Sequence, residues 1–254
     1  MRVKKKVLLL GPAYPYRGGI ADTQNYLAQN LSRLGHEVLV YTFKYQYPKL
    51  LFPGKTQYSS VPMPKGIDIK RKIHSINPIN WIKISNEINH YDPDIVLFRY
   101  WTPFLAPCWI WIAKRLSSKI KKIALVDNWI PHDKKPWDKT MNDLFGKTMD
   151  AFVTLSNAVA KEIMEDKPKT PIWSGFHPIA DDLPKIISKA VARKKLGWSK
   201  EKKIVLFFYC AKHHTTNELL GEMLYMFCCH YPINSVSSTH FSRSSRSVLK
   251  LMIQ

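Results

Sequence analysis

The chain has 254 residues, of which 45% are hydrophobic and 12% aromatic, and this composition excludes a disordered or low-complexity protein. Domains usually contain about 100 to 200 residues, so the chain has room for one or two cores. With 39 Lys and Arg against 19 Asp and Glu, its net charge is +20. That charge predicts a surface that attracts phosphates, anionic lipid or nucleic acid. Four cysteines are too few for a disulfide scaffold and indicate a reducing compartment.

Two apolar segments could be mistaken for targeting or membrane segments. Lysines precede the apolar run at residues 7–10, as in a signal peptide, but Gly11 and Pro12 end that run before the roughly 7 to 15 residues that a signal peptide needs. The most apolar long window, residues 95–113, contains an arginine and two prolines, which a membrane-spanning helix of about 20 residues would not readily tolerate. We therefore expect a buried strand at 7–10 and no transmembrane segment.

Short apolar runs alternate with helical patterns along most of the chain. Strands separated by helices of about 10 to 15 residues are typical of right-handed crossovers and a parallel sheet covered on both faces. The first helix has Ile20, Leu27 and Leu34 on one face and Gly35 as its stop. The pattern predicts a Rossmann-like α/β fold with a doubly wound parallel sheet. The predicted strands are residues 7–10, 37–43, 95–100, 123–126, 151–155 and 204–208.

The connections carry their own signals. Residues 44–66 contain four prolines and are interpreted as a loop, with an edge strand near 58–63. A helix is expected around 81–88 and a basic helix at 185–196, with a linker at 177–184 between the last strand of the sheet and this basic helix.

The domain organisation follows from these elements. In the last part of the chain the apolar spacing loses both the helix and the strand period, and no βα unit can be traced. We predict an N-terminal domain at 1–176, a linker and basic helix at 177–200, the first strand of a second, incomplete domain at 201–208, and a divergent tail at 209–254.

The glycine loop after the first strand is the first candidate site. Ligands of a parallel α/β sheet bind beyond the carboxyl ends of the strands. There, Arg17, Gly18 and Gly19 precede a helix whose free amides and dipole favour an anion. The loop lacks the GxGxxG spacing of nicotinamide enzymes, which disfavours a dehydrogenase. On spacing alone, a tight turn with positive φ fits Gly18 and Gly19 as well as phosphate contact does.

Polar side chains also follow the later strands. Arg99 stands at the end of the predicted strand 95–100, and Asp127, Asn128 and His132 follow the predicted strand 123–126. A base, a carboxylate and an amide within six residues could hold a sugar hydroxyl or a transferring proton, and the alternative is a solvated loop with a packed tryptophan. Ser156 stands where the predicted strand 151–155 meets the following helix, and we interpret it primarily as the N-cap of that helix.

The tail contains several cysteines and histidines. They lack paired CxxC or HxxxH spacing, and the adjacent Cys228 and Cys229 suit a single tetrahedral ion poorly. We therefore predict no metal site.

Six segments of the chain form a joint pattern, namely KVLLLGPAYPYRGGIADTQNYLAQNLSRLGHEVLVYTF, DPDIVLFRYW, LVDNWIPHD, DAFVTLSNAVAKEI, HPIADDL and ARKKLGW with KKIVLFF. Together they resemble glycosyltransferase family 4. The resemblance implies the GT-B fold, in which two Rossmann-like domains face each other across a cleft, with the acceptor on the N-terminal domain and the nucleotide sugar mainly on the C-terminal one. It implies a retaining transfer of a sugar from a nucleotide-sugar donor to a lipid-linked or polysaccharide acceptor, as in cell-envelope polysaccharide biosynthesis, with no cofactor and usually no metal.

The resemblance also implies roles for individual residues. Gly18 and Gly19 match the glycine loop that lies near the donor phosphates and the acceptor. His132 matches the cleft histidine near the transferred sugar and is the candidate catalytic residue. Ser156 matches the serine that begins the helix after the sixth strand. The other cleft candidates are chosen for their positions after the predicted strands rather than for the resemblance. They are Arg99, Asp127 and Asn128.

The sequence departs from the family after residue 208. The family continues with a glycine, an Arg and a Lys that grip the donor diphosphate, and later two glutamates seven residues apart. Here Tyr209-Cys210-Ala211-Lys212 replaces that loop, and Glu218 and Glu222 are only four residues apart. Translation in a shifted frame would produce such an abrupt change. We therefore expect a truncated transferase with little or no activity, which lacks on the order of another 100 to 150 residues.

Other functions remain open. One alternative is a non-catalytic module, made from the first domain, that binds an acceptor or a membrane. The basic charge fits an anionic inner leaflet or a pyrophosphate-linked acceptor, and it also fits a merely solvated surface. Nucleic-acid binding is disfavoured because no helix-turn-helix, aromatic RNP-like strand or zinc-finger spacing accompanies the charge. We expect a cytoplasmic protein that is peripheral at the inner membrane face.

Overall fold

The computed structural model describes residues 3–47, 58–59, 62–131, 135–167, 169–177 and 186–201, and the backbone of 209–210 and 247–248. The chain divides into two compact units, residues 1–182 and 183–254. In the first unit, seven parallel strands form one sheet in the order β3-β2-β1-β4-β5-β6-β7. The strands are β1 Lys6–Leu10, β2 Glu37–Tyr45, β3 Asp68–His74, β4 Ile95–Tyr100, β5 Lys121–Val126, β6 Ala151–Thr154 and β7 Ile172–Ser174. This arrangement confirms the predicted Rossmann-like α/β fold.

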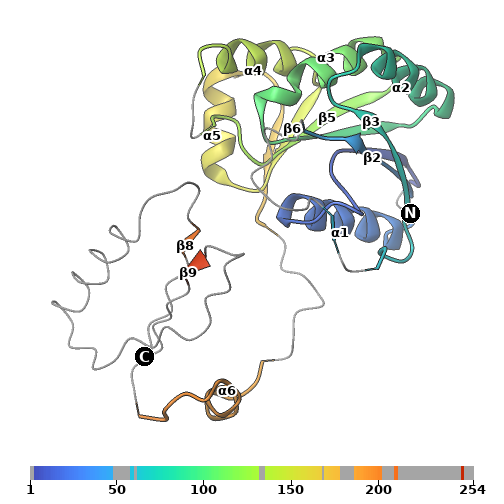
Figure 1. Cartoon of the computed structure of the whole chain (residues 1–254). Coiled ribbons are helices and arrows are strands. Elements are labelled where there is room, and N and C mark those ends of the chain that lie inside the picture. The colour runs from blue at the N-terminus through green and yellow to red at the C-terminus, as the bar shows by residue number, and fades with distance from the viewer. Residues whose placement is uncertain are drawn as a thin grey trace. The chain divides into compact units, whose positions relative to one another are not determined.

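The direction of the chain determines which face of the sheet each helix covers. From β1 to β3 the chain winds toward one edge of the sheet, and from β4 onward it winds toward the other. Because βαβ crossovers are right-handed, the two halves place their helices on opposite faces. Figure 1 shows α1 on one face and α2 to α5 on the other. The helices are α1 Gly19–Arg33, α2 Pro78–Tyr91, α3 Ala106–Arg115, α4 Asp138–Gly146 and α5 Asn157–Asp166.

Local sequence signals set the ends of these helices. Helix α2 begins at Pro78, and the preceding Asn77 side chain accepts hydrogen bonds from the amides of Ile79 and Asn80, at 3.0 and 3.2 Å. An asparagine cap followed by a proline at the first helical position is a strong start signal. At the other end of α2, Asp92 takes a left-handed conformation with φ 51°.

Most of the core lies between the sheet and helices α2 to α5. Large aromatic side chains fill it, among them the fully buried Phe98, Trp109 and Phe152. Tyr100 stacks on Phe145 with ring centroids 4.2 Å apart. Such aromatic pairs contribute about 0.5–1.5 kcal/mol beyond the burial of their area. A smaller core, which includes Val7, Leu9, Ala28 and Val40, lies on the face covered by α1.

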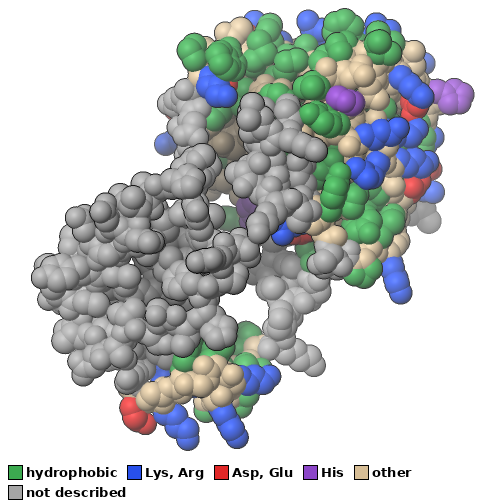
Figure 2. All heavy atoms as spheres, in the orientation of Figure 1, with side chains coloured by type: hydrophobic (Ala, Val, Ile, Leu, Met, Phe, Trp, Pro, Cys, Tyr) green, Lys and Arg blue, Asp and Glu red, His purple; other side chains and the backbone are tan. Residues whose placement is uncertain are grey.

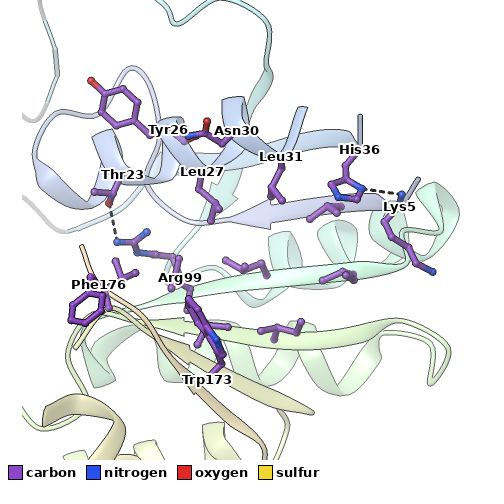
Figure 3. A pocket seen from close by; sticks show the side chains of 17 residues that line it. Lys5, Thr23, Tyr26, Leu27, Asn30, Leu31, His36, Arg99, Trp173 and Phe176 are labelled. Carbon is purple, nitrogen blue, oxygen red and sulfur yellow. Dashed lines mark hydrogen bonds between the residues drawn. The ribbon is translucent and has the colours of Figure 1, made fainter. Parts of the chain in front are cut away.

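The α1 face of the sheet is only partly covered within the described residues. An apolar trough of about 470 Å³ runs from α1 over the residues of β4 to β7 that face the same side (Figure 3). Leu97 and Ile123 on its floor are half-buried, and Trp173 and Phe176 at its far side are 63% and 86% exposed. Among the residues that the structure describes, the expected cover on both faces of the sheet is therefore present on the α2–α5 face, and on the other face beneath α1.

Five of the predicted strands correspond to β1, β2, β4, β5 and β6, with ends within two residues. The predicted edge strand near 58–63 is wrong. Tyr58 makes a single bridge to Tyr16, and the strand beside β2 at this edge of the sheet is β3, several residues further along. The sequence of β3, DIKRKIH, is mostly charged because an edge strand faces solvent, so it lacks the apolar run of the inner strands. The predicted strand 204–208 lies outside the described residues.

In the second unit the structure describes one helix and a short strand pair. Helix α6, Lys189–Leu196, corresponds to the predicted basic helix and begins after Ser188, whose hydroxyl caps it by accepting the Val191 amide. Gly197, with φ 66°, ends it. The two-residue strands Tyr209–Cys210 and Ser247–Val248 pair antiparallel. Of the predicted linker at 177–184, the structure describes only its first residue.

Candidate functional site

The switch point of the sheet lies between β1 and β4. These neighbouring strands belong to the two halves that wind in opposite directions, so the loops after them diverge and leave a crevice at their carboxyl ends. A cleft of about 480 Å³ lies at this edge. Three strand ends contribute to it, namely the glycine loop and first turn of α1 after β1, Gln46 and Tyr47 after β2, and Trp101 after β4.

The glycine loop places the positive end of α1 in the cleft. Gly18 is the N-cap residue, with φ 110°, a conformation that favours glycine. Since glycine has no side chain, nothing at this position caps the first-turn amides, and no side chain in the described part of the chain does so. The neighbouring Arg17 is exposed and makes no ion pair with another described residue. The loop therefore offers free amides, a helix dipole and a guanidinium to an anion.

An aromatic wall faces the glycine loop. Trp101 Nε1 donates to the Tyr47 hydroxyl at 2.7 Å, and the Trp101 ring packs edge-on against Phe43 with centroids 6.4 Å apart. Burial raises the pKa of Tyr47, so its hydroxyl stays protonated at neutral pH. Beside it, Gln46 Oε1 is buried and accepts no hydrogen bond from another described residue. A buried acceptor without a donor fits a site where a ligand hydroxyl supplies the hydrogen bond.

The floor of the cleft includes a second neutral phenol. Burial, and to a smaller extent the nearby Tyr58, raise the pKa of Tyr16 to about 12. Tyr16 and Tyr58 rings lie 5.5 Å apart. The cleft thus combines aromatic surfaces, neutral hydroxyls and an amide oxygen with one cationic end. This combination suits a polyhydroxylated ligand that carries a negative charge.

Arg99 and Asp127, two of the predicted cleft residues, bind each other. Arg99 is 1% exposed, and its Nε donates to Asp127 Oδ2 at 2.5 Å while its Nη2 donates to Asp127 Oδ1. The same Nη2 donates to Thr23 Oγ1 of α1 at 2.9 Å (Figure 3). The bidentate pair joins the carboxyl ends of β4 and β5 to α1 and supports the crevice from beneath.

The remaining predicted residues have different positions. Ser156 caps α5, as the sequence predicts, and its hydroxyl accepts the Ala158 amide at 3.2 Å. Asn128 is half-buried directly after Asp127. Trp129 is the predicted packed tryptophan, since it is fully buried and donates from Nε1 to Asp166 at 2.9 Å. His132, the candidate catalytic residue, lies outside the described residues.

Sequence reasoning missed part of the cleft. The predicted second strand ended at residue 43, whereas β2 continues to Tyr45, so Gln46 and Tyr47 stand at a strand end rather than inside a long loop. An extension of the apolar-aromatic run through Tyr45 was the available signal. Thr23 carried no signal, because its role depends on the packing of α1 over β4.

Within the described ranges, no three His, Cys, Asp or Glu side chains come close enough together to hold an ion. Cys228, Cys229 and the nearby histidines lie outside those ranges.

Comparisons with known proteins concern the family and the fold of the chain. The model of Glycosyltransferase Family 4 matches residues 17–173. No curated protein sequence matches the chain. Its fold is similar to that of sucrose-phosphate synthase (tll1590) from Thermosynechococcus elongatus, with TM-score 0.54, 10% identity, and coverage of 79% of this chain and 55% of that one.

A second solved structure is similar to a comparable degree. Anabaena Alr3699/HepE in complex with UDP and glucose has a TM-score of 0.51 and 11% identity, with 76% of this chain and 50% of that chain covered. Identities this low compare the fold alone. The chain spans about half the length of these structures.

Proposed function

Because the chain belongs to glycosyltransferase family 4 by the match over residues 17–173, we propose that its cleft serves the transfer of a sugar from a nucleotide-sugar donor to a glycan or lipid-linked acceptor. The first unit has the Rossmann-like fold of one half of a GT-B enzyme. HepE was solved with UDP-glucose, which supports a nucleotide sugar as the donor in the proposal.

One observation carries the proposal. The N-terminus of α1, which no described side chain caps, and the guanidinium of Arg17, which pairs with no described carboxylate, lie with an aromatic wall in one cleft at the switch point. Sugar rings pack on aromatic faces through their C–H groups, and phosphates bind helix N-termini and arginine. A ligand that is both sugar and phosphate uses both halves of the cleft. We assign the phosphate to the Gly18–Gly19 loop and the sugar to the side of Trp101 and Tyr47.

The proposed mechanism depends on positioning and charge stabilisation. In a transfer of this class the bond between the sugar and the diphosphate breaks as the acceptor oxygen attacks, and negative charge develops on the leaving diphosphate. The α1 amides and Arg17 face a developing charge of that sign. We place His132 beside the transferred sugar on the basis of the family resemblance. The buried Arg99–Asp127 pair positions β4, β5 and α1, and Asn128 and Ser156 complete the same edge of the sheet.

We also propose that the 254-residue chain alone turns over little or no nucleotide sugar. The residues at 209–212 differ from the glycine, Arg and Lys with which the family grips the donor diphosphate. A second candidate function, a non-catalytic module that binds the acceptor, is favoured by the compact first unit at residues 1–182. Sustained release of UDP from UDP-glucose by this chain would contradict both statements.

Ligand titration followed by NMR tests the site. We expect glucose 1-phosphate to bind the chain more tightly than glucose does, because only the former supplies an anion for the glycine loop. Arg17→Ala should weaken glucose 1-phosphate binding about tenfold, the effect of losing one charge-assisted hydrogen bond of about 1.5 kcal/mol. Trp101→Ala should weaken the binding of both glucose and glucose 1-phosphate.

The control is Lys4→Ala, which removes one exposed cation outside the cleft. It should bind both sugars as the wild type does. Equal affinity for glucose and glucose 1-phosphate, or the same loss in Lys4→Ala as in Arg17→Ala, would overturn the assignment.

A further inference from the structure

A shallow apolar groove lies on the outer surface of α3 and α4. Its volume is about 510 Å³, and we call it the α3–α4 groove. Its apolar lining includes Pro107, Ile110 and Trp111 of α3 and Leu144 of α4, and its cationic residues are Lys114 and Arg115. Trp111 is 42% exposed and Leu144 is 38% exposed. Figure 2 shows hydrophobic side chains gathered over the helices at the top of the view, with Lys and Arg among them.

The core explains only part of the apolar outer side of α3, because Ile110 packs against the core while Trp111 is exposed. The inner side of the helix already packs on the sheet, where Cys108, Trp109 and Ile112 are fully buried. A surface helix normally turns polar side chains outward. On α3 the exposed side carries the indole of Trp111 as well as Lys114 and Arg115, with the half-buried Ile110 beside them. The Trp111 ring is tilted against Trp81 of α2, with centroids 6.2 Å apart, and this contact leaves Trp111 42% exposed.

The charge around the groove is positive. Lys114 and Arg115 are exposed, and neither makes an ion pair with another described residue. Cations in the last turn of a helix complement its dipole, which accounts for part of their presence. Helix α3 contains no carboxylate. Helix α4 has two: Asp143 is paired with Lys147 and Lys167, and Asp138 is buried and accepts the Lys135 amide. The groove therefore presents uncompensated positive charge beside an exposed indole.

We propose that the α3–α4 groove docks the protein on an anionic lipid bilayer. An indole prefers the interface between headgroups and acyl chains, since it is apolar with one polar N–H. In the bound state Trp111 and Leu144 enter the headgroup layer, and Lys114 and Arg115 lie at the level of the lipid phosphates. Basic side chains next to exposed aromatic and aliphatic residues are the pattern of peripheral membrane surfaces.

This inference does not depend on the sugar chemistry. The groove lies on helices that cover one face of the sheet, and none of its residues lines the cleft at the α1 N-terminus. Vesicle binding can be measured without any nucleotide sugar. Loss of sugar binding and loss of membrane binding are therefore separate results.

Sedimentation of the full chain with vesicles tests the proposal. We expect binding to vesicles of phosphatidylcholine with 30% phosphatidylglycerol at 0.1 M NaCl, and much weaker binding at 0.5 M NaCl or with phosphatidylcholine alone, because salt screens surface charges. Each cation at the bilayer surface adds roughly a factor of five to the partition coefficient. The double variant K114E/R115E should therefore have a partition coefficient at least about 25-fold lower than that of the wild type.

A charge-matched control separates local docking from net charge. K4E/K65E changes two exposed lysines outside the groove, so its net charge equals that of K114E/R115E. It should retain most of the binding. Trp111→Ser should weaken binding at both salt concentrations, because it removes the inserted ring rather than a charge.

Three results would overturn the proposal. The first is equal loss of vesicle binding in both charge variants, which would indicate nonspecific attraction. The second is vesicle binding by Trp111→Ser and K114E/R115E as strong as that of the wild type. The third is a wild-type dimer that these substitutions dissociate while no vesicle binds, which would make the groove a contact between two copies of the chain.

Discussion

Gly11 and Arg99 approach so closely at the carboxyl ends of β1 and β4 that a Cβ atom on Gly11 would lie 2.6 Å from the Cβ of Arg99. Gly11 also has a φ of +155°, which side chains rarely adopt. The absence of a side chain at residue 11 therefore lets α1, β1 and β4 meet at the switch point. The Arg99 side chain then continues to Asp127 and Thr23.

We predict that Gly11→Ala lowers the free energy of unfolding by about 2–4 kcal/mol, since it adds a steric overlap to an unfavourable backbone conformation. The clash involves a Cβ, which cannot rotate away. Urea unfolding followed by circular dichroism measures the change. Gly19→Ala is the control, because a Cβ there meets no atom within 4 Å. Equal stability of Gly11→Ala and Gly19→Ala would show that the close approach does not exist in solution.

The Arg99–Asp127 pair gives a second prediction. Arg99→Met leaves a carboxylate that is 13% exposed without its partner, which should destabilise the protein by about 3–5 kcal/mol. Arg99→Lys should recover only part of this, because an ammonium cannot form the two-pronged contact. Lys70→Met breaks an exposed pair with Asp68 and should cost less than about 1 kcal/mol. A loss for Arg99→Met as small as for Lys70→Met would contradict the buried pair.

The sequence predicted the inner strands well and the site only in part. Strand β1 has an uninterrupted apolar run because helices or loops cover both of its faces, so its pattern is visible in the sequence. Strand β3 has one exposed edge, and only Ile73 of its seven residues is fully buried. Its pattern is therefore close to that of a loop.

The pairing of Arg99 with Asp127 shows why site residues are harder to predict than strands. Both were predicted as cleft residues, and each was expected to face a ligand. In the structure Arg99 is opposite Leu125 in the parallel register of β4 and β5, and Asp127 follows two residues later on the same face. The two side chains thus meet each other. Register depends on packing across the whole sheet, which no local pattern encodes.

Tyr100 provides a prediction about the core. Its hydroxyl donates to Asn142 Oδ1 at 2.6 Å, and Asn142 Nδ2 donates to the Trp129 carbonyl at 2.6 Å. Burial raises the pKa of Tyr100 well above its ordinary value, so the group is a neutral donor. Tyr100→Phe leaves a buried oxygen without a donor and should cost about 1–3 kcal/mol in urea unfolding.

Tyr91→Phe is the matched control for that prediction. The Tyr91 hydroxyl donates to Glu37 at 3.1 Å near the surface, where water replaces a lost partner. We expect a loss under about 1 kcal/mol. If Tyr100→Phe is no more destabilising than Tyr91→Phe, the Tyr100–Asn142–Trp129 chain contributes nothing specific to the core.

Asp143 should make stability depend on acid pH. Hydrogen bonds from Lys147 and Lys167 lower its pKa to about 2, below the value of about 3.9 for a free aspartate. A lowered pKa in the folded state means that the pair stabilises the protein above about pH 4 and loses this contribution as the pH falls toward 2. The side chain is 43% exposed, so we expect only about 1 kcal/mol or less after screening by solvent. The difference in unfolding free energy between wild type and Asp143→Asn should therefore be positive at pH 5 and shrink at pH 2.5. A difference that stays constant between these two pH values would show that Asp143→Asn acts through packing rather than through the charge.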